Sequence, residues 1–306
     1  MRRQLQIPRY EVKDYPKDSL EKVRELFSQA FGGRTISLDM LEWQMSLNPC
    51  VRERAVSLWD GETLVAYTAL TPSVAFLYGK EDIVAVSGTT MADPHYMGCS
   101  LQLYSECSKR NNDITIIYGF PNRNSYPIAV KCMGHHYVGD IAFWISGAKS
   151  ISVSERIQEF DEFCKGYEDI SVKLSSSHLF IKKRQKDYLN WRFFMKPEYD
   201  YRGFEYEGRG YIIVNTYEEN GQKQLQIVDI LADSDDIMVE LLRYAINTAY
   251  QWDCDVVKLW LTSGRFSSLL KDNGFTYGEH PFPLTIWNQE LDIANSYITM
   301  ADSDIF

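Results

Sequence analysis

The sequence lacks several patterns that would identify a function directly. Its six cysteines stand at scattered positions with no C-x-x-C pair, which excludes common zinc-ligand spacings and argues against a disulfide framework. No run approaches the roughly 18 apolar residues of a membrane-spanning helix. The chain begins MRRQLQIPRY, with two arginines directly after Met1 and no apolar stretch behind them, unlike a signal peptide. We therefore expect a cytoplasmic protein that does not enter a membrane.

An excess of positive charge is also missing. The net charge is −10, from 32 basic and 42 acidic residues, and this argues against a nucleic-acid partner, which would need a basic surface. The densest basic run, at residues 182–186, is expected to be solvated. His135 and His136 have no cysteine or carboxylate at ligand spacing, so no metal site is predicted. Asp229 interrupts an apolar strand and faces either a cleft or a wet sheet edge.

What is present is an ordinary globular composition and a regular order of elements. The 306 residues suggest two domains, and 45% apolar residues provide a full core. Residues 1–145 predict a strand, two helices, antiparallel strands, and then helix, strand, helix and strand. Residues 146–177 lose this regularity and predict a connecting segment with one helix at residues 154–167. The fold class predicted is a mixed α/β (α+β) sheet flanked by helices.

The second half, residues 178–306, repeats motifs of the first. LEWQMSLNP at residues 41–49 recurs as LNWRFFMKP at residues 189–197, and KCMGHHY at 131–137 recurs as KDNGFTY at 271–277. An Ala-Asp pair after a long strand recurs at residues 92–93 and 232–233. The offsets between the matched motifs lie between 140 and 148 residues. Ordered matches at nearly constant offset predict an internal duplication.

The turn between the strand at residues 83–91 and the next helix is the first place to look for a ligand. A helix N-terminus presents unpaired N–H groups and the positive end of its dipole, which can hold a pyrophosphate. Gly98 is the single glycine of this turn, so either a partial phosphate cradle or a plain strand-to-helix turn fits the residues. Cys99, at the helix start, would have a lowered pKa if it were a nucleophile, but no partner histidine can be assigned.

The order of elements resembles the GNAT N-acetyltransferase family. Residues 118–127, YGFPNRNSYP, followed by a short helix and Met-Gly-His-His-Tyr, look like the fifth strand and fourth helix of that family. DYLNWRF at residues 187–193 is similar to a phrase of tandem GNAT-like proteins. The resemblance covers nearly the whole chain as two GNAT-like copies, and it is more specific in the first copy than in the second.

This resemblance implies transfer of an acetyl group from acetyl-CoA to an amine of a small molecule or sugar. The donor would lie between the strands at residues 83–91 and 114–118, with backbone N–H groups near Thr90 and Met91 holding the thioester carbonyl. Asn122 and Asn124 would contact the pantetheine arm. Tyr126 would protonate the departing thiolate, or else only pack at a helix start. A carboxylate or a chain of waters would deprotonate the acceptor amine.

The chain departs from the family in its pyrophosphate loop. The expected Gln or Arg, central Gly and final small residue fall on Met97, Ser100 and Gln102. Gly98, Cys99 and Ser100 still offer N–H groups, but weaker binding is expected because each Cβ opposes close approach. The second copy has no glycine here and added acidic residues, so it should not bind a pyrophosphate. Two alternatives follow: a non-catalytic binding or scaffold protein, or an aminoacyl transferase using tRNA, which the negative charge disfavours.

Overall fold

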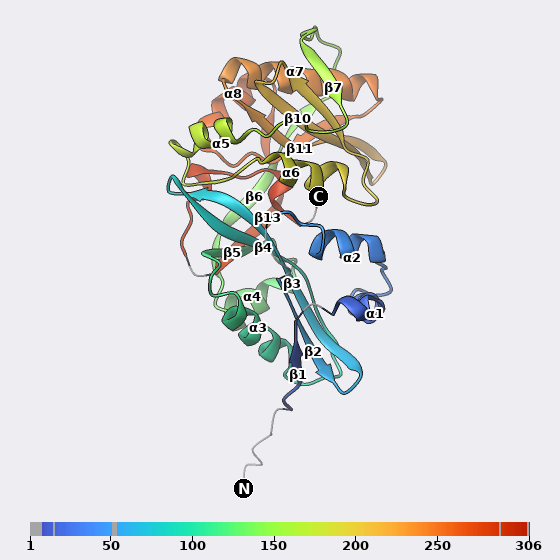
Figure 1. Ribbon diagram of the computed structural model, residues 1–306. Coiled ribbons are helices and arrows are strands. Elements are labelled where there is room, and N and C mark those ends of the chain that lie inside the picture. Colours follow the sequence, from blue (N-terminus) through green and yellow to red (C-terminus); the bar gives the residue numbers. More distant parts are fainter. Residues whose placement is uncertain (1–7, 15, 51–53, 288, 305) are drawn as a thin grey trace.

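The computed structural model describes residues 8–14, 16–50, 54–287, 289–304 and 306. Its main sheet has the strand order β1-β2-β3-β4-β5-β13-β6-β12-β11-β10-β9-β7, with β8 attached to β3 and β14 attached to β8. Helices flank this sheet, and the C-terminus lies near the middle of the molecule (Figure 1). The predicted mixed α/β architecture is therefore confirmed. In the described ranges no helix is both long and apolar enough to cross a membrane.

The first half follows the predicted order of elements. Ser37 caps the second helix by accepting a hydrogen bond from the Met40 N–H, and Gly61 makes the first hairpin turn with φ 58°. Its elements are β1 (Glu11–Lys13), η1 (Lys17–Ser19), α1 (Leu20–Ala30), α2 (Leu38–Met45), β2 (Arg54–Asp60), β3 (Thr63–Leu77), β4 (Lys80–Ala92), α3 (Cys99–Arg110), β5 (Ile116–Gly119), α4 (Tyr126–Cys132) and β6 (His136–Gly147).

The second half contains the same core pattern after a different beginning. Its elements are β7 (Ile157–Phe160), α5 (Glu168–Ser175), β8 (Phe180–Lys182), α6 (Lys186–Leu189), the π-helical turn η2 (Asn190–Phe194), β9 (Arg202–Tyr206), β10 (Gly210–Glu219), β11 (Gln222–Ala232), α7 (Asp235–Gln251), β12 (Val256–Leu259), η3 (Gly264–Phe266), α8 (Ser267–Asp272), β13 (Thr276–Trp287), η4 (Ile293–Asn295), β14 (Ser296–Tyr297) and η5 (Met300–Asp302).

The helix predicted at residues 154–167 is wrong. That segment instead forms the edge strand β7, which pairs antiparallel with β9. Ile157 and Phe160 are spaced three apart, as on one face of a helix, but both ends of this short strand find partners across the sheet. Tertiary pairing therefore overrides the local helical spacing.

The two halves exchange their last long strands. β13 lies between β5 and β6, while β6 lies between β13 and β12. The order β3-β4-β5-β13 of the first half is thus matched by β10-β11-β12-β6 in the second. In both sets the second and third strands are parallel and the others antiparallel. This arrangement has approximate two-fold symmetry about a line between β13 and β6.

The matched tryptophans of the two halves contact each other. Trp43 Nε1 donates to the Trp191 carbonyl at 2.7 Å, and Trp191 Nε1 donates to the Trp43 carbonyl at 2.9 Å. Their rings stack at 4.7 Å with an interplanar angle of 11°. Reciprocal contacts of this kind are expected for residues related by a two-fold axis. The pair and the strand order support the internal duplication that we infer from the sequence.

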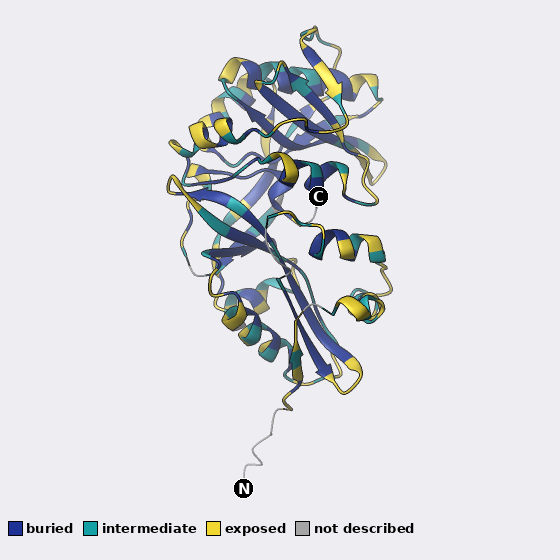
Figure 2. Cartoon of the chain, in the orientation of Figure 1, coloured by how far each residue is buried: buried dark blue, intermediate teal, exposed yellow. Residues whose placement is uncertain are grey.

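One large hydrophobic core joins the halves. It includes Val86 and Tyr118 of the first half together with Trp191, Leu241 and Trp260 of the second. Figure 2 shows buried residues along the sheet and exposed residues on the outer sides of the helices. Smaller clusters lie under α3 and beneath α1 and α2. The main core crosses the boundaries proposed at residues 145 and 178, which stay a prediction.

The prediction that the basic run is solvated is wrong at two positions. Lys182 and Arg184 are 3% and 1% exposed, whereas Lys186 is exposed. Both buried cations lie close to Asp302, and Arg184 also binds Asp229 through two hydrogen bonds. A buried charge is tolerated when it is paired in this way, and the acidic partners come from distant parts of the chain.

Candidate active site

The central strands of the first half separate part-way along their length. β4 and β5 are parallel, and their last pair is Val86 with Tyr118. β4 continues to Ala92 beyond this point, whereas β5 ends at Gly119. The carboxyl ends of parallel strands lie at the same sheet edge, so the segments after β4 and β5 flank one opening.

A β-bulge lies in β4 just beyond the separation. Thr89 and Thr90 both oppose Thr68 of β3, and Thr89 has φ 48°, a left-handed conformation that a β-branched residue rarely adopts. Thr89 Oγ1 donates to Gln44 of α2, and the Thr90 and Thr68 hydroxyls lie 2.8 Å apart. Met91, the second residue predicted to hold the thioester, has its side chain buried under α1 and α2. A bulge interrupts the regular ladder, and strained backbone of this kind is concentrated at functional sites.

The N-terminus of α3 has no side-chain cap. Gly98 occupies the N-cap position with φ 79°, and the first turn contains no acidic residue. The predicted site residues Met97, Cys99 and Ser100 surround it: Met97 is exposed, Cys99 is buried and Ser100 is half-buried. Burial raises the pKa of the Cys99 thiol, which argues against a reactive thiolate. The helix therefore begins with N–H groups that side chains do not satisfy.

Two neighbouring groups modify this helix start. The Asp93 carboxylate accepts hydrogen bonds from the backbone N–H of His95 and pairs with its ring, and the first of these bonds is the main cause that lowers the pKa of Asp93. Gln102, at the position where the GNAT loop has a small residue, exchanges hydrogen bonds with the backbone of Tyr10. Gln102 thus ties Tyr10, the residue before β1, to α3, and it uses one of its two side-chain N–H donors to do so.

The loop after β5 is organised by Asn122. Its side-chain oxygen accepts hydrogen bonds from the N–H groups of Asn124 at 2.9 Å and Ser125 at 3.0 Å, which turns the chain into α4. Asn124 is exposed. Tyr126 begins α4, and its ring meets that of Tyr137 edge-on at 6.0 Å. These residues follow the carboxyl end of β5, where Asn122 serves as a loop cap, and the donor-site roles predicted for them stay predictions.

A small cavity of about 40 Å³ lies between α3, the residues after α4, and the sheet. Ser87 of β4 and Ile117 of β5 contribute to it from the sheet, and Tyr104 from α3. His135 also lines it, with Nδ1 3.3 Å from the Thr285 hydroxyl. Burial lowers the pKa of His135 to about 4, so this imidazole is neutral at physiological pH. Among the described residues, no group of three or more His, Cys, Asp or Glu side chains is placed to hold a metal ion.

On the other face of the sheet, Asp304 lies against β4. A Cβ placed on Gly88 would be 2.8 Å from Oδ2 and 3.2 Å from Cβ of Asp304. Asp304 keeps solvent-exposed surface, yet desolvation raises the pKa of its carboxyl to about 6, although Lys196, Arg192 and Lys182 lower it. Asp304 was missed from the sequence, where nothing distinguishes it from other acidic residues near the C-terminus.

The corresponding separation in the second half is closed by the chain itself. Beyond the last pair of β11 with β12, the Tyr297 hydroxyl donates to the Ile230 carbonyl of β11 at 2.6 Å. The Thr262 N–H, after β12, donates to the Ile298 carbonyl, and the Ile298 N–H donates to the Thr262 hydroxyl. Residues 296–299 therefore join the two strands where the first half leaves them apart.

The bulge of β11 carries Asp229 in place of a threonine. Tyr211 and Thr299 donate to its carboxylate at 2.7 and 2.8 Å, and Arg184 binds both of its oxygens at 3.0 Å. Asp229 is fully buried, so the alternative that it lies at a solvent-exposed sheet edge is wrong. Thr299 also begins a capping box with Asp302, which continues the segment towards Asp304.

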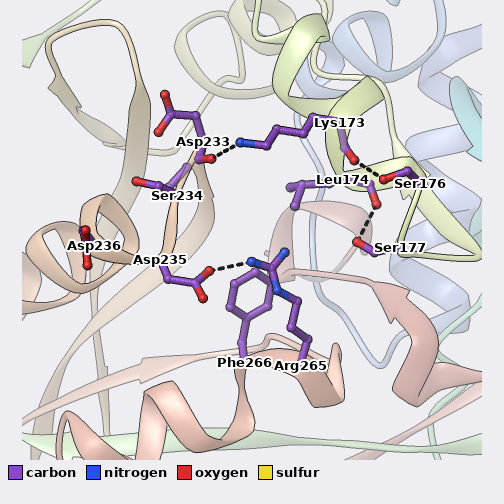
Figure 3. Close-up of a pocket in the computed structure, with 11 residues that line it drawn as sticks. Lys173, Leu174, Ser176, Ser177, Asp233, Ser234, Asp235, Asp236, Arg265 and Phe266 are labelled. Atoms are coloured by element: carbon purple, nitrogen blue, oxygen red, sulfur yellow. Dashed lines mark hydrogen bonds and ion pairs between the residues drawn. The ribbon is translucent and has the colours of Figure 1, made fainter.

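A cavity of about 440 Å³ lies at the N-terminus of α7 (Figure 3). Its cations are already engaged: Lys173 donates to the Asp233 carbonyl, and Arg265 pairs with Asp235, both at 2.6 Å. Ser234 caps the helix by accepting from the Ile237 N–H. An acidic, capped helix start is a poor fit for a pyrophosphate, and the absence of such binding in the second half stays a prediction.

Comparison with known proteins gives a consistent fold and little sequence similarity. No protein-family model matches the chain, and no curated protein matches it. Among solved structures, a conserved protein of unknown function from Enterococcus faecalis is 15% identical with TM-score 0.67, covering 94% of this chain and 74% of its own. A GCN5-related N-acetyltransferase from Anabaena variabilis is 14% identical with TM-score 0.65, covering 91% and 72%. Saccharomyces cerevisiae N-myristoyltransferase, solved with myristoyl-CoA, is 12% identical with TM-score 0.60, covering 97% and 86%.

Proposed function

We propose, from the premise that this chain has the fold of the GCN5-related N-acetyltransferases, that it is an acyl-CoA-dependent N-acyltransferase. Its substrates are acetyl-CoA and the amine of a small molecule or sugar. The observation that carries the proposal is the carboxylate of Asp304 held against Gly88, beside the bulge of β4. An ionisable group with a raised pKa at a strained strand opening is the arrangement that amine acylation needs.

The donor would enter from the side of α3 and α4. The uncapped helix start at Gly98, Cys99 and Ser100 offers N–H groups to a pyrophosphate, without the extra contacts of the usual glycine-rich loop. The arm of CoA would then pass Asn122 and Asn124 to reach the bulge. There the N–H groups near Thr90 and Met91 would stabilise the charge that develops on the thioester oxygen.

The reaction requires two proton transfers. Asp304 would accept a proton from the acceptor amine as its nitrogen forms a bond to the thioester carbon. Collapse of the tetrahedral intermediate breaks the C–S bond and releases the CoA thiolate. Tyr126 would donate the proton that the thiolate takes up. Asp304 must be ionised to act, so activity is expected to fall as the pH drops through about 6.

The aromatic side chains beyond the end of β5 favour a short acyl group. Phe120 follows β5 directly, and its ring lies 5.3 Å from that of Trp260. Trp260 also packs against Phe143, Phe282 and Phe306, at ring distances from 5.0 to 5.9 Å. These side chains fill the region over β5, β13, β6 and β12, where a long acyl chain would need room. The proposed donor is therefore acetyl-CoA rather than a long-chain acyl-CoA.

The test begins with donor binding, measured by calorimetry with acetyl-CoA and myristoyl-CoA. We expect a Kd in the micromolar range for acetyl-CoA and much weaker binding of myristoyl-CoA. Release of CoA thiol is then followed with a panel of primary amines and amino sugars. The Asp304→Asn variant should lose about 100-fold or more in kcat, with acetyl-CoA binding unchanged. Tyr126→Phe should lose less, because water can also protonate a thiolate.

The rival function has its own outcome in the same experiment. The non-catalytic binding protein is favoured by Met97, Ser100 and Gln102, which replace the phosphate-binding pattern. Absence of acetyl-CoA binding at millimolar concentration would overturn the acyltransferase proposal. Tight binding with no thiol release for any amine, and with no difference between Asp304→Asn and wild type, would also support the rival.

A further inference from the structure

Thr89 holds an unusual backbone conformation in the bulge of β4. Its φ of 48° crowds the Cβ against the backbone, and among the described residues it is the only β-branched one with a positive φ. Such a conformation persists only when the surrounding structure holds it in place. The side chain of Thr89 is held by one hydrogen bond, from its Oγ1 to Oε1 of Gln44 at 3.1 Å.

The bulge is attached on both faces of the sheet. Ala69 of β3 packs under α1 and α2, whereas the next residue, Leu70, packs under α3, so these helices cover opposite faces. Gln44 belongs to α2 and holds Thr89 from that side. On the side of α3, the Thr90 hydroxyl lies 2.8 Å from that of Thr68, which lines the small cavity there.

Gln44 is itself fixed in position. Its side chain is only 8% exposed, and its Nε2 donates to the hydroxyl of Thr71 in β3 at 3.5 Å. It directly follows Trp43, whose ring stacks on that of Trp191 and whose indole N–H donates to the Trp191 carbonyl. The oxygen that accepts the Thr89 hydroxyl is therefore held by contacts with both halves of the chain.

The aligned residue of the second half serves the other side of the proposed site. In the repeat that we infer, LEWQ of the first half matches LNWR of the second, so Gln44 corresponds to Arg192. Arg192 donates to the carbonyls of Ala301 at 3.1 Å and Ser303 at 3.3 Å, directly before Asp304. The residue after the matched tryptophan thus holds the bulge in one half and the segment that carries Asp304 in the other.

The stretch that Gln44 holds has a free edge. Of the described strands, only β3 pairs with β4 beyond Val86, because the pairing of β5 with β4 ends there. Backbone groups on that edge of residues 88–91 face the opening rather than another strand. Their direction depends on the φ of Thr89, since each dihedral sets the orientation of the peptide units that follow.

We propose that Gln44 is a positioning residue for acyl transfer: by accepting the Thr89 hydroxyl it keeps the bulge in its left-handed conformation and so directs the N–H groups near Thr90 and Met91. This inference rests on the proposed function, in which those N–H groups stabilise the charge on the thioester oxygen. A misdirected donor weakens binding of the charged intermediate more than binding of the neutral thioester. Loss of Gln44 should therefore lower kcat and leave donor affinity unchanged.

The test replaces Gln44 by Met, which keeps the length of the side chain and removes the acceptor. We expect kcat to fall about 10-fold or more, with an unchanged Kd for acetyl-CoA by calorimetry. The matched control is Asn247→Leu in α7. Asn247 is also 8% exposed, and its side-chain oxygen accepts one hydrogen bond, from the Ile151 N–H at 3.2 Å. The control should lose a similar amount of thermal stability and keep its kcat.

A double-mutant cycle tests whether Gln44 acts through Thr89. Thr89→Ala removes the hydroxyl, so in that background Gln44→Met should cause little further loss of kcat. A loss as large as in the wild-type background would show that Gln44 acts by another route, and an equal loss of kcat in Asn247→Leu would show that the effect is only one of stability. Either result would overturn the proposal.

A measurement without substrate separates this inference from the proposed function. The backbone ¹³C chemical shifts of Thr89 distinguish left-handed from extended conformations and are recorded for the free protein. In Gln44→Met they should move towards extended values, and in Asn247→Leu they should stay as in wild type. This outcome supports the role of Gln44 in holding the bulge even if no amine is acylated. Unchanged Thr89 shifts in folded Gln44→Met protein would overturn it.

Discussion

The two halves place a bulge at the same point of the sheet and use it differently. In β4 the bulge follows Gly88 and opens towards Asp304, with Thr89 bonded to Gln44. In β11 the bulge carries Asp229, which is enclosed by Arg184 and further hydrogen-bond donors. Residues 296–299 then join β11 to the chain after β12. In the second half the space between the two strands is thus filled by residues 296–299, and the chain continues from this segment to Asp304.

The helices that follow β4 and β11 also differ, in the capping and charge of their first turns. α3 starts at Gly98 without a side-chain cap or an acidic first turn, and it ends with Lys109 and Arg110. α7 starts with the Ser234 cap and two aspartates, and nine of its 17 residues are buried. A capped helix with complementary charge is stable without a ligand. An uncapped start is less stable and is suited to binding an anion.

The largest effect is expected from Asp229→Asn. The change leaves Arg184 buried at 1% exposure with one fewer carboxylate, so the free energy of unfolding should fall by about 3 to 5 kcal/mol. Urea denaturation with an unchanged m-value measures the loss. The equivalent change in the first half, Thr89→Ala, removes one hydrogen bond to Gln44 and should cost about 1 kcal/mol. Equal losses for the two variants would contradict the division of roles between the bulges.

Substitutions at the bulge of the first half should instead lower activity. Gly88→Ala places a methyl group against Asp304 and should displace its carboxylate, with a loss of about 100-fold in kcat. Gly147→Ala in β6 is the control, because a Cβ there meets no atom within 4 Å. Thermal unfolding of both variants checks that the fold survives. If Gly88→Ala were as active as Gly147→Ala, the contact between Asp304 and β4 would have no part in the reaction.

Local patterns were enough to predict the elements of the first half, and they are the basis on which we infer the repeat. The hairpin at Gly61 and the cap at Ser37 depend on residues close in sequence, and the two matched tryptophans lie in contact. The strand order was consistent with the family resemblance. The exchange of β6 and β13 left no trace in the sequence, because each strand pairs with a partner in the other half.

The chemistry on the acceptor side could not be predicted in this way. Asp304 meets Gly88 across 216 positions of sequence, and its altered pKa comes from desolvation and from cations elsewhere in the fold. Lys182 and Arg184 looked solvated because their partners, Asp229 and Asp302, are also distant. Pairing over such separations is determined by tertiary structure alone. The roles of Tyr126 and the other predicted donor-site residues stay predictions.

The smallest expected effect concerns a further difference between the halves, at the ends of α4 and α8. His135 of the first half corresponds to Phe275 of the second, each following a glycine, and both are buried. Burial lowers the pKa of His135 to about 4 in the folded state, below the value of about 6.5 in an unfolded chain. Between these values the unfolded chain binds a proton that the native protein does not, so stability falls as the pH falls. From pH 7 to pH 5 the contribution of this group is about 1 to 2 kcal/mol.

His135→Phe should remove that part of the acid sensitivity, and the cavity beside His135 leaves some room for the larger ring. The measurement is the difference in unfolding free energy between wild type and variant at the two pH values. The reverse change, Phe275→His, should add acid sensitivity to the second half; parallel pH dependence in all three proteins would show that neither position titrates during unfolding.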